Sequence, residues 1–203
     1  METKSSIRKQ MLTCRNALSI CDIKEKSSAI MQNVLSLIPV QKAEYILCYA
    51  GYKSEVSTEE LMIKLLEHGK KVYLPRVSGE EMEFYRIKSL AELAQGYKGI
   101  PEPSFECLDM FSKDLWETKK EQVIMLLPGA AFSEEGARIG YGKGYYDRYL
   151  SKIPCSKRIA LCFELQIAKH IPADVHDIPV TTIVTEEKVR HIISSEESKH
   201  IYI

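Results

Sequence analysis

The stretch that decides the fold is YILCYAGYKSEVSTEELMIKLLEHGKKVYL, residues 45–74. It begins with the apolar run 45–50, which is typical of a buried β-strand, and it ends with a second short apolar run at 71–74. Between these runs, Ser57 and Glu60 have the spacing of a capping box, which predicts the start of a helix. A helix between two short apolar strands indicates a βαβ unit, and therefore a pair of parallel strands.

Segments on both sides of this stretch extend the pattern. We expect buried strands at 123–127, 158–163 and 182–184, and a strand with one solvated face at 81–86. Two amphipathic helices are expected before the first strand, and the second of them begins at a capping box headed by Ser19.

The predicted fold class is α/β: a three-layer, Rossmann-like sandwich around a mainly parallel sheet, with residues 1–203 in one domain. Hydrophobic residues make up 45% of the chain, and 28 basic residues balance 28 acidic ones. This composition excludes a disordered tail protein, a collagen-like fibre and a strongly basic nucleic-acid coat. In such a sheet, sites are expected at the carboxyl ends of the strands.

The sequence also indicates a compartment. No apolar run approaches the ~20 residues that span a bilayer, and the polar N-terminus has no signal-peptide core behind it. We therefore expect a cytoplasmic monomer with neither a membrane nor a nucleic acid as partner. The six cysteines contain no C-x-x-C pair, which predicts reduced, mostly buried thiols and no zinc site.

The densest motif follows the strongest predicted strand: LPGAAFSEEGARIGYGKGYYD, residues 127–147. Three glycines alternate within 140–144, and backbone N–H groups approach an anion closely only where no Cβ intervenes. Arg138 and Lys143 add charges that suit phosphate oxygens. Asp147 follows closely enough to hold a magnesium ion beside a bound phosphate.

This motif differs from the common phosphate-binding loops. Lys143 is followed by Gly rather than by the Ser or Thr of a Walker A loop, and no G-x-G-x-x-G follows the strand directly. From the residues alone, a glycine-rich surface turn without a ligand stays an alternative.

The same stretch resembles the signature of the 5-formyltetrahydrofolate cyclo-ligases, also called methenyltetrahydrofolate synthetases. The matching residues are Pro128-Gly129, Ala131-Phe132, Gly136-Ala-Arg138-Ile-Gly140 and Gly144-Tyr-Tyr-Asp147. Further matches along the chain are Lys4 and Arg8, Ser54-Glu55-Val56 with Thr58, Leu74-Pro-Arg76, Gly99-Ile-Pro-Glu-Pro103, and Phe163, Gln166, Ile171-Pro172 and His176-Asp177. The resemblance implies an α/β enzyme that uses ATP and Mg²⁺ to convert 5-formyltetrahydrofolate to 5,10-methenyltetrahydrofolate, releasing ADP and phosphate.

The resemblance also implies roles for individual residues. ATP contacts are implied for Lys4, Arg8, Arg138, Ile139, Gly140, Tyr141, Gly142, Lys143, Gly144, Tyr145 and Tyr146. Contacts with the folate substrate are implied for Ala50, Glu55, Tyr141, Gly142, Lys143, Gly144 and Tyr145. Lys143 and Arg138 are the implied catalytic residues, because their charges would neutralise the transferring phosphoryl group. Without the resemblance, Glu55 would be interpreted as a surface residue ahead of a helix.

Two carboxylates match the magnesium ligands of the family, Asp147 and Asp177. Magnesium usually takes one or two carboxylates together with waters and phosphates, so two would be enough. The chain departs from many relatives at Thr181, where they carry an acid four residues after the His-Asp pair. This departure puts a third acidic group in doubt and leaves Asp177 untouched.

The implied reaction needs no side-chain nucleophile, because phosphorylation of the formyl oxygen creates the leaving group and N10 of the same molecule attacks. Two alternatives from other classes stay open. One is a protein that binds folate and nucleotide without turnover, against which the intact Lys143, Arg138 and Asp147 argue. The other is a phosphate-handling enzyme on a related fold, such as a sugar-phosphate isomerase or a CoA-transferase-like protein, which leaves Lys4 and Arg8 unexplained.

Overall fold

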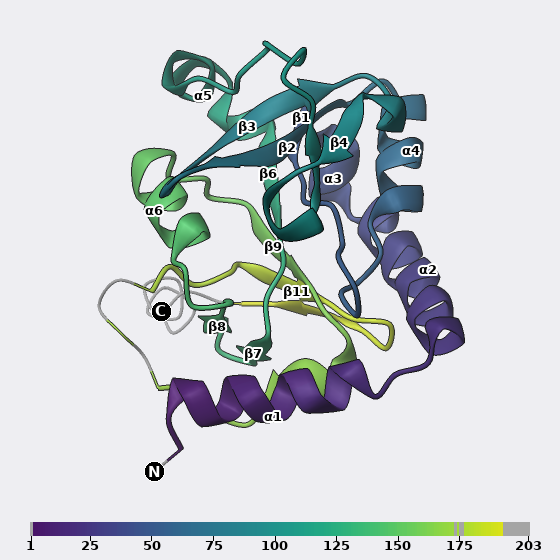
Figure 1. Cartoon of the computed structure of the whole chain (residues 1–203), viewed down its shortest axis with the longest axis vertical. Helices are drawn as coiled ribbons and strands as arrows, with labels where there is room; N and C mark the ends of the chain where they lie inside the picture. Colours follow the sequence, from purple (N-terminus) through teal and green to yellow (C-terminus); the bar gives the residue numbers. More distant parts are fainter. Residues whose placement is uncertain (1, 173, 175–176, 193–203) are drawn as a thin grey trace, which may run out of the picture.

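The computed structural model describes residues 2–172, 174 and 177–192. Within these residues the centre of the molecule is a seven-stranded sheet in the order β12-β11-β9-β6-β1-β2-β3 (Figure 1). Its strands are β1 (Tyr45–Leu47), β2 (Lys71–Ser78), β3 (Glu81–Ile87), β6 (Val123–Leu127), β9 (Arg158–Leu161), β11 (Thr182–Val184) and β12 (Val189–His191). The four inner pairs are parallel, and β2–β3 and β11–β12 at the edges are antiparallel. The predicted mainly parallel sheet is therefore confirmed.

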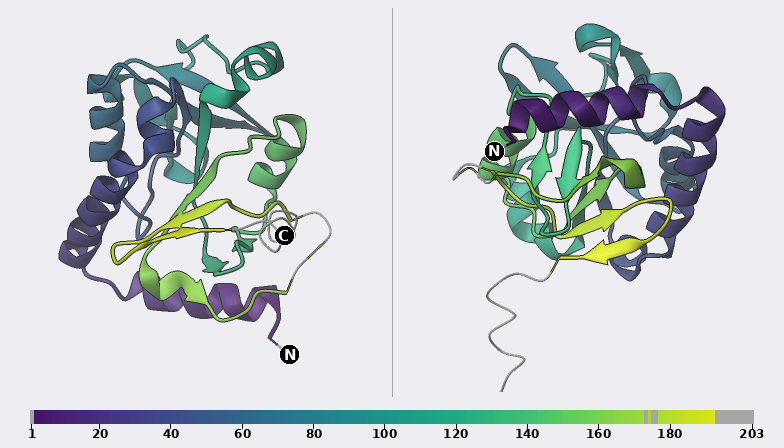
Figure 2. Two further views of the ribbon diagram at one scale, coloured as in Figure 1. Left: turned by 180° about the vertical axis from the view of Figure 1, so that it is seen from behind. Right: turned by 90° about the horizontal axis from the view of Figure 1, so that it is seen from below.

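Helices cover both faces of this sheet, which makes the predicted three layers (Figures 1 and 2). One face carries α2 (Ile20–Ser36), α3 (Ile38–Lys42) and α4 (Glu59–Glu67), and the other carries α5 (Lys113–Lys119) and α6 (Tyr145–Lys152). Along β6, Ile124 and Leu126 belong to the core under the first group of helices. Val123, Met125 and Leu127 alternate with them and belong to the core under the second group. A strand that is apolar on both faces needs this double cover.

A second, smaller layer lies at the lower end of the molecule in Figure 1, where α1 (Lys4–Asn16) crosses it. The inner face of α1 packs on a three-stranded sheet in the order β10-β7-β8. Its strands are β7 (Ala131–Ser133), β8 (Arg138–Ile139) and β10 (Ile167–Ala168). Ile7 of α1 packs with Ala131, Ile139 and Ala168 in a core of its own. This arrangement places the first helix against the glycine-rich stretch.

An antiparallel pair, β4 (Leu93–Gln95) and β5 (Pro101–Pro103), is held against β2. Arg76 of β2 donates hydrogen bonds to the carbonyls of Pro103 (3.0 Å) and Cys107 (2.9 Å). The turn between the two strands is the 3₁₀ helix η2 (Tyr97–Gly99). The remaining 3₁₀ helices of the described chain are η1 (Leu90–Glu92), η3 (Lys120–Gln122) and η4 (Glu164–Gln166).

Of the two predicted capping boxes, one is confirmed and one is wrong. Asp22 N–H donates to the Ser19 hydroxyl (3.1 Å), and the Asp22 carboxylate accepts from the Ser19 N–H (3.1 Å). At the start of α4 the N-cap residue is Thr58 rather than Ser57, and its side chain makes no cap hydrogen bond. Its hydroxyl accepts from Gly51 N–H (3.0 Å) instead. This bond fixes the loop after β1, which lines the site described below.

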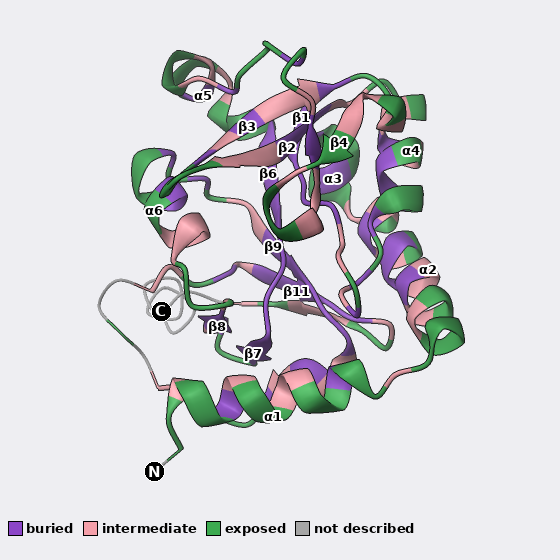
Figure 3. Ribbon diagram, in the orientation of Figure 1, coloured by how far each residue is buried: buried purple, intermediate pink, exposed green. Residues whose placement is uncertain are grey.

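The buried residues of the central strands and the exposed outer faces of the helices are visible in Figure 3. Four of the six cysteines are buried, which confirms that most of the thiols are buried, while Cys14 and Cys21 are exposed and none of the six is in a disulfide. Within the described residues, no helix combines the length and the apolar character that crossing a membrane requires.

Candidate active site

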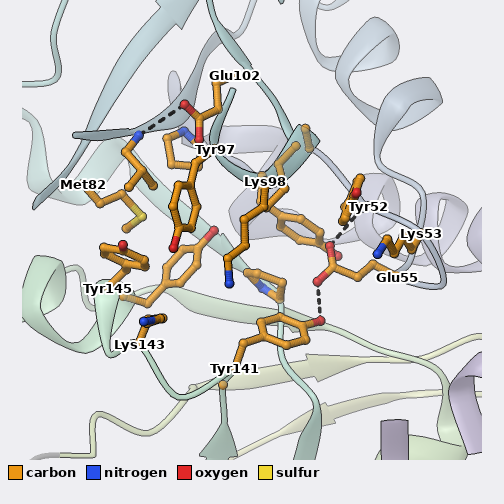
Figure 4. A pocket seen from close by; sticks show the side chains of 18 of the residues that line it. Tyr52, Lys53, Glu55, Met82, Tyr97, Lys98, Glu102, Tyr141, Lys143 and Tyr145 are labelled. Atoms are coloured by element: carbon orange, nitrogen blue, oxygen red, sulfur yellow. Dashed lines mark hydrogen bonds between the residues drawn. The ribbon is translucent and has the colours of Figure 1, made fainter. Parts of the chain in front are cut away.

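A cavity of about 430 Å³ opens at the carboxyl ends of the central strands. Ala50 lies just beyond the end of β1, Val77 lies in the last part of β2, and Pro128 follows β6 directly. The cavity is thus where a parallel sheet is expected to place a ligand. Figure 4 shows its lining side chains, which converge from the loop after β1, the η2 turn and the glycine-rich stretch.

One wall of the cavity is the glycine loop, residues 140–144, together with the start of α6. Gly142 and Gly144 have φ values of +90° and +67°, a region that favours glycine. Gly144 is the N-cap residue of α6 and has no side chain that accepts the free N–H groups of the first turn. An uncapped helix start next to a cavity favours a bound anion.

The charged side chains of this wall are Arg138, Lys143 and Asp147. The Arg138 side chain is only 3% exposed, and its Nη2 donates to the Asp147 carboxylate (2.7 Å). The Arg138 Nε atom is buried and has no hydrogen-bond partner among the described residues. Lys143 is exposed and forms no ion pair within the described chain. The exposed ammonium group of Lys143, which has no ion-pair partner within the described chain, leaves this wall able to bind negative charge.

The first turns of α1 reach the same loop from outside the cavity. The Arg8 Nε atom donates to the carbonyl of Gly140 (2.8 Å). Lys4 forms an ion pair with Asp177, whose carboxylate also accepts from the N–H of Asp174 (2.8 Å). The structure thus joins Lys4 to Asp177, although neither lines the cavity. Ile139 does not line it either, because its side chain is buried beneath α1.

The two carboxylates predicted to bind magnesium differ in their place relative to the cavity. Asp147 lines the cavity beside the helix start, where one carboxylate together with phosphate oxygens could hold the ion, whereas Asp177 does not line it. Both are ion-paired, Asp147 with Arg138 and Asp177 with Lys4. The described residues contain no cluster of three or more His, Cys, Asp or Glu side chains suited to a metal, and His176 lies outside them.

The opposite wall holds Glu55 in the loop after β1 (Figure 4). One carboxylate oxygen of Glu55 accepts from the Tyr141 hydroxyl, and the other accepts from the N–H of Tyr52 (2.9 Å). Burial raises the pKa of the Glu55 carboxyl, which these two hydrogen bonds and the charge of Arg15 lower in part. Glu55 therefore lines the cavity, and its contact with the folate substrate stays a prediction.

Several cavity residues were missed by the sequence analysis, notably Arg15, Tyr97, Lys98 and Glu102. Arg15 follows Lys4 by 11 positions, which is about three helical turns, so helical periodicity would have placed both on one face of α1. Lys98 has a φ of +56° in the η2 turn, and Figure 4 shows its ammonium group reaching into the cavity. No local signal marks that reach, because it depends on how β4 and β5 pack against β2.

Comparison with known proteins agrees with this geometry. The model of the 5-formyltetrahydrofolate cyclo-ligase family matches residues 1–186. The chain belongs to this family. The 5-formyltetrahydrofolate cyclo-ligase of Saccharomyces cerevisiae is 30% identical to this chain and covers 91% of it and 95% of its own length. The mouse enzyme of the same name is 28% identical, with 91% and 94% covered.

Solved structures in this family have the same fold. The structure of Aquifex aeolicus 5,10-methenyltetrahydrofolate synthetase has a TM-score of 0.80 and 32% identity, and the match covers 95% of this chain and 94% of the other. The synthetase of Mycoplasma pneumoniae has a TM-score of 0.71 at 24% identity, with 91% and 99% covered, which supports the fold assignment alone.

Proposed function

We propose that this chain is a 5-formyltetrahydrofolate cyclo-ligase, which uses ATP to form 5,10-methenyltetrahydrofolate and releases ADP and phosphate. The observation that carries the proposal is one cavity with two unlike walls. The glycine loop and the uncapped start of α6 suit phosphates, and the buried carboxylate of Glu55 suits the N–H donors of a pterin ring. Membership of the family supplies the reaction that joins these two ligands.

The chemistry explains why the two walls face one cavity. The formyl oxygen attacks the γ-phosphorus of ATP, ADP leaves, and the formyl carbon becomes electron-poor. N10 then attacks this carbon, loses its proton, and phosphate departs as the five-membered ring closes. The substrate itself brings N10 close, so the protein mainly aligns the γ-phosphate with the formyl oxygen and neutralises charge.

The nucleotide wall supplies the neutralising charge. Lys143 offers a free ammonium group, and the Arg138 guanidinium beside Asp147 adds a second positive charge. The N–H groups at the start of α6 add a donor set that needs no reorganisation during the reaction. We propose that Arg8 supports the loop from outside the cavity, because its side chain donates a hydrogen bond to the Gly140 carbonyl and so holds the loop backbone. Asp147 is the residue that would hold Mg²⁺, which when bound neutralises phosphate charge.

The folate wall orients the other substrate. Glu55 would accept hydrogen bonds from the pterin, and the rings of Tyr97 and Tyr145, 6.4 Å apart edge to face, offer apolar surface beside it. Lys98 makes no ion pair within the described chain, and its ammonium group would suit a carboxylate of the substrate's glutamate moiety.

We further propose that the enzyme works as a monomer in the cytoplasm, where its six free thiols stay reduced.

The experiment that tests the proposal is a steady-state assay with 5-formyltetrahydrofolate, following the near-ultraviolet absorbance of the methenyl product with and without Mg-ATP. We expect product only when ATP is present. Binding of both ligands without product would favour the non-catalytic binding protein. Absence of binding by either ligand would contradict the proposal and leave the phosphate-handling alternatives to test.

A further inference from the structure

Arg15 joins three separate segments at the floor of the cavity. It lies in the last turn of α1 and is only 5% exposed. Its Nη1 donates to the Tyr141 hydroxyl (2.7 Å) and to the carbonyl of Gly129 (3.2 Å), and its Nε donates to the Ser54 hydroxyl (3.1 Å). Arg15 forms no ion pair with any described carboxylate. Its hydrogen-bond partners are all neutral, although the Glu55 carboxylate interacts with it electrostatically. Burying a guanidinium without a direct ion pair is costly, so its position calls for a role beyond packing.

Tyr141 extends this contact to the opposite wall. Its oxygen accepts from Arg15, so its proton is free to point elsewhere, and it donates to the Glu55 carboxylate. Figure 4 shows the Tyr141 hydroxyl next to the Glu55 carboxylate, with a dashed line for their hydrogen bond. Tyr141 itself stands between Gly140 and Gly142, inside the loop that faces the phosphates. Tyr141 therefore belongs to the nucleotide wall through its backbone, and its hydroxyl contacts the folate wall.

We propose that Arg15 is a positioning residue, which acts through the Tyr141 hydroxyl to couple the position of the glycine loop to the orientation of the Glu55 carboxylate. The inference rests on the proposed function. A nucleotide that fixes the loop fixes the Tyr141 hydroxyl and thereby Glu55, so nucleotide and folate strengthen each other's binding. Thermodynamic linkage requires this strengthening to be equal in both directions.

The surroundings of Glu55 give this coupling a pH signature. The titratable and charged groups around it are Arg15 from α1, Tyr141 from the glycine loop, Tyr146 from α6 and Tyr49 after β1. Burial raises the pKa of Glu55, while the Tyr141 hydroxyl, the Tyr52 N–H and Arg15 lower it. Removing either Arg15 or the hydroxyl raises this pKa further. As the pH is lowered, the affinity of the variant for folate would then begin to fall at a higher pH than the affinity of the wild type does.

The test is calorimetric titration of 5-formyltetrahydrofolate into the full chain, with and without a saturating non-hydrolysable ATP analogue and Mg²⁺. In the wild type we expect the analogue to lower the Kd for folate by about 10-fold, within the usual range of coupling between sites. In Tyr141→Phe we expect the ratio of the folate Kd without the analogue to the folate Kd with it to fall below about twofold. In the same variant, the loss of folate affinity at acid pH should begin at a higher pH than in the wild type.

Arg15 is tested with Arg15→Lys, which keeps the charge and loses the planar fork, and with Arg15→Gln. Both should lose the coupling, and adding Tyr141→Phe to Arg15→Gln should lower the ratio no further, because the residues act in one chain of contacts. Since Arg15 is buried and its loss could unfold the chain, Tyr141→Phe, which changes a half-exposed residue, decides the matter.

Tyr85→Phe is the matched control, since Tyr85 packs beneath Arg76 outside the cavity lining, and it should behave like the wild type. A Tyr141→Phe ratio equal to that of the wild type would overturn the coupling, as would a wild-type ratio of one. Wild-type protein that binds neither ligand would overturn the proposed function itself and this inference with it.

Discussion

The two walls of the cavity differ in whether their charged groups already have partners. The glycine loop is largely exposed, carries positive φ at Gly142 and Gly144, and includes Lys143, which forms no ion pair within the described chain. On the other wall, Glu55 is a charged group in a half-buried position, and both of its oxygens already accept hydrogen bonds. The nucleotide wall thus has a charged group that lacks a partner until an anion binds. On the folate wall, the Glu55 carboxylate is already oriented by hydrogen bonds before a ligand binds.

Under the proposed function, the two walls would gain the binding free energy of their substrates in different ways. The nucleotide wall would gain new charge contacts when phosphates bind, and its exposed Lys143 contributes little to the stability of the folded state. The folate wall has its carboxylate oriented in advance, and the raised pKa of Glu55 shows that the folded state is destabilised by that placement. Substitutions on the two walls should therefore separate catalysis, substrate affinity and stability.

The largest effect is expected from Lys143→Ala on the nucleotide wall. Loss of a charge that neutralises the transferring phosphoryl group should lower kcat/KM for ATP by about 100- to 1,000-fold. Because Lys143 is exposed and unpaired within the described chain, the Tm should stay within about 2 °C of wild type. Lys64→Ala, on the exposed face of α4, is the control. Activity near the wild-type level would remove the loop lysine from the mechanism.

Glu55→Gln on the folate wall comes next. Replacing a charged acceptor by a neutral one should raise the KM for 5-formyltetrahydrofolate by about 10- to 30-fold, the cost of weakening a hydrogen bond to a charged group. The KM for ATP should rise by less than the KM for folate, because Glu55 reaches the glycine loop only through the Tyr141 hydroxyl. Steady-state kinetics with each substrate varied in turn measures both values. A larger effect on ATP than on folate would reverse the assignment of the two walls.

Gly142→Ala should have a smaller effect, which separates backbone strain from ligand contact. A Cβ at a φ of +90° is strained by about 1 kcal/mol, although its nearest neighbour, Arg8, is 3.8 Å away. The loop should shift, and the Kd for ATP should rise about fivefold, as expected for roughly 1 kcal/mol. Gly69→Ala is the matched control, because Gly69 also has positive φ (+74°) with nothing near its Cβ position and lies away from the cavity. It should lose similar stability and keep its ATP affinity.

The smallest expected effect is a gain in the stability of Glu55→Gln. The pKa of Glu55 is raised in the folded state, so its ionised form costs stability at any pH above that raised value. The variant should therefore have a higher Tm than the wild type at pH 8. This gain should vanish as the pH falls below about 4.3, the usual pKa of an unfolded Glu. Thermal melts from pH 4 to pH 8 measure it, and a lower Tm at pH 8 would contradict the strained placement of Glu55.

The sequence predicts the central sheet well, because strands such as 123–127 are apolar on both faces and leave little choice of partner. It also indicates the glycine loop, whose residues are contiguous. The small sheet under α1 was not predicted, since β8 and β10 have only two residues each and exist through their pairing with β7. The link from Arg15 through Tyr141 to Glu55 joins positions 126 and 86 residues apart, which no local pattern reveals.

The most direct test of the proposed chemistry follows the formyl oxygen. 5-Formyltetrahydrofolate labelled with ¹⁸O in its formyl group would be converted with unlabelled ATP, and the inorganic phosphate would be analysed by mass spectrometry. If the formyl oxygen is phosphorylated on this enzyme, the phosphate released should carry the label. Unlabelled phosphate, with the ¹⁸O recovered in water, would contradict phosphorylation of the formyl oxygen and with it the alignment of the two walls described above.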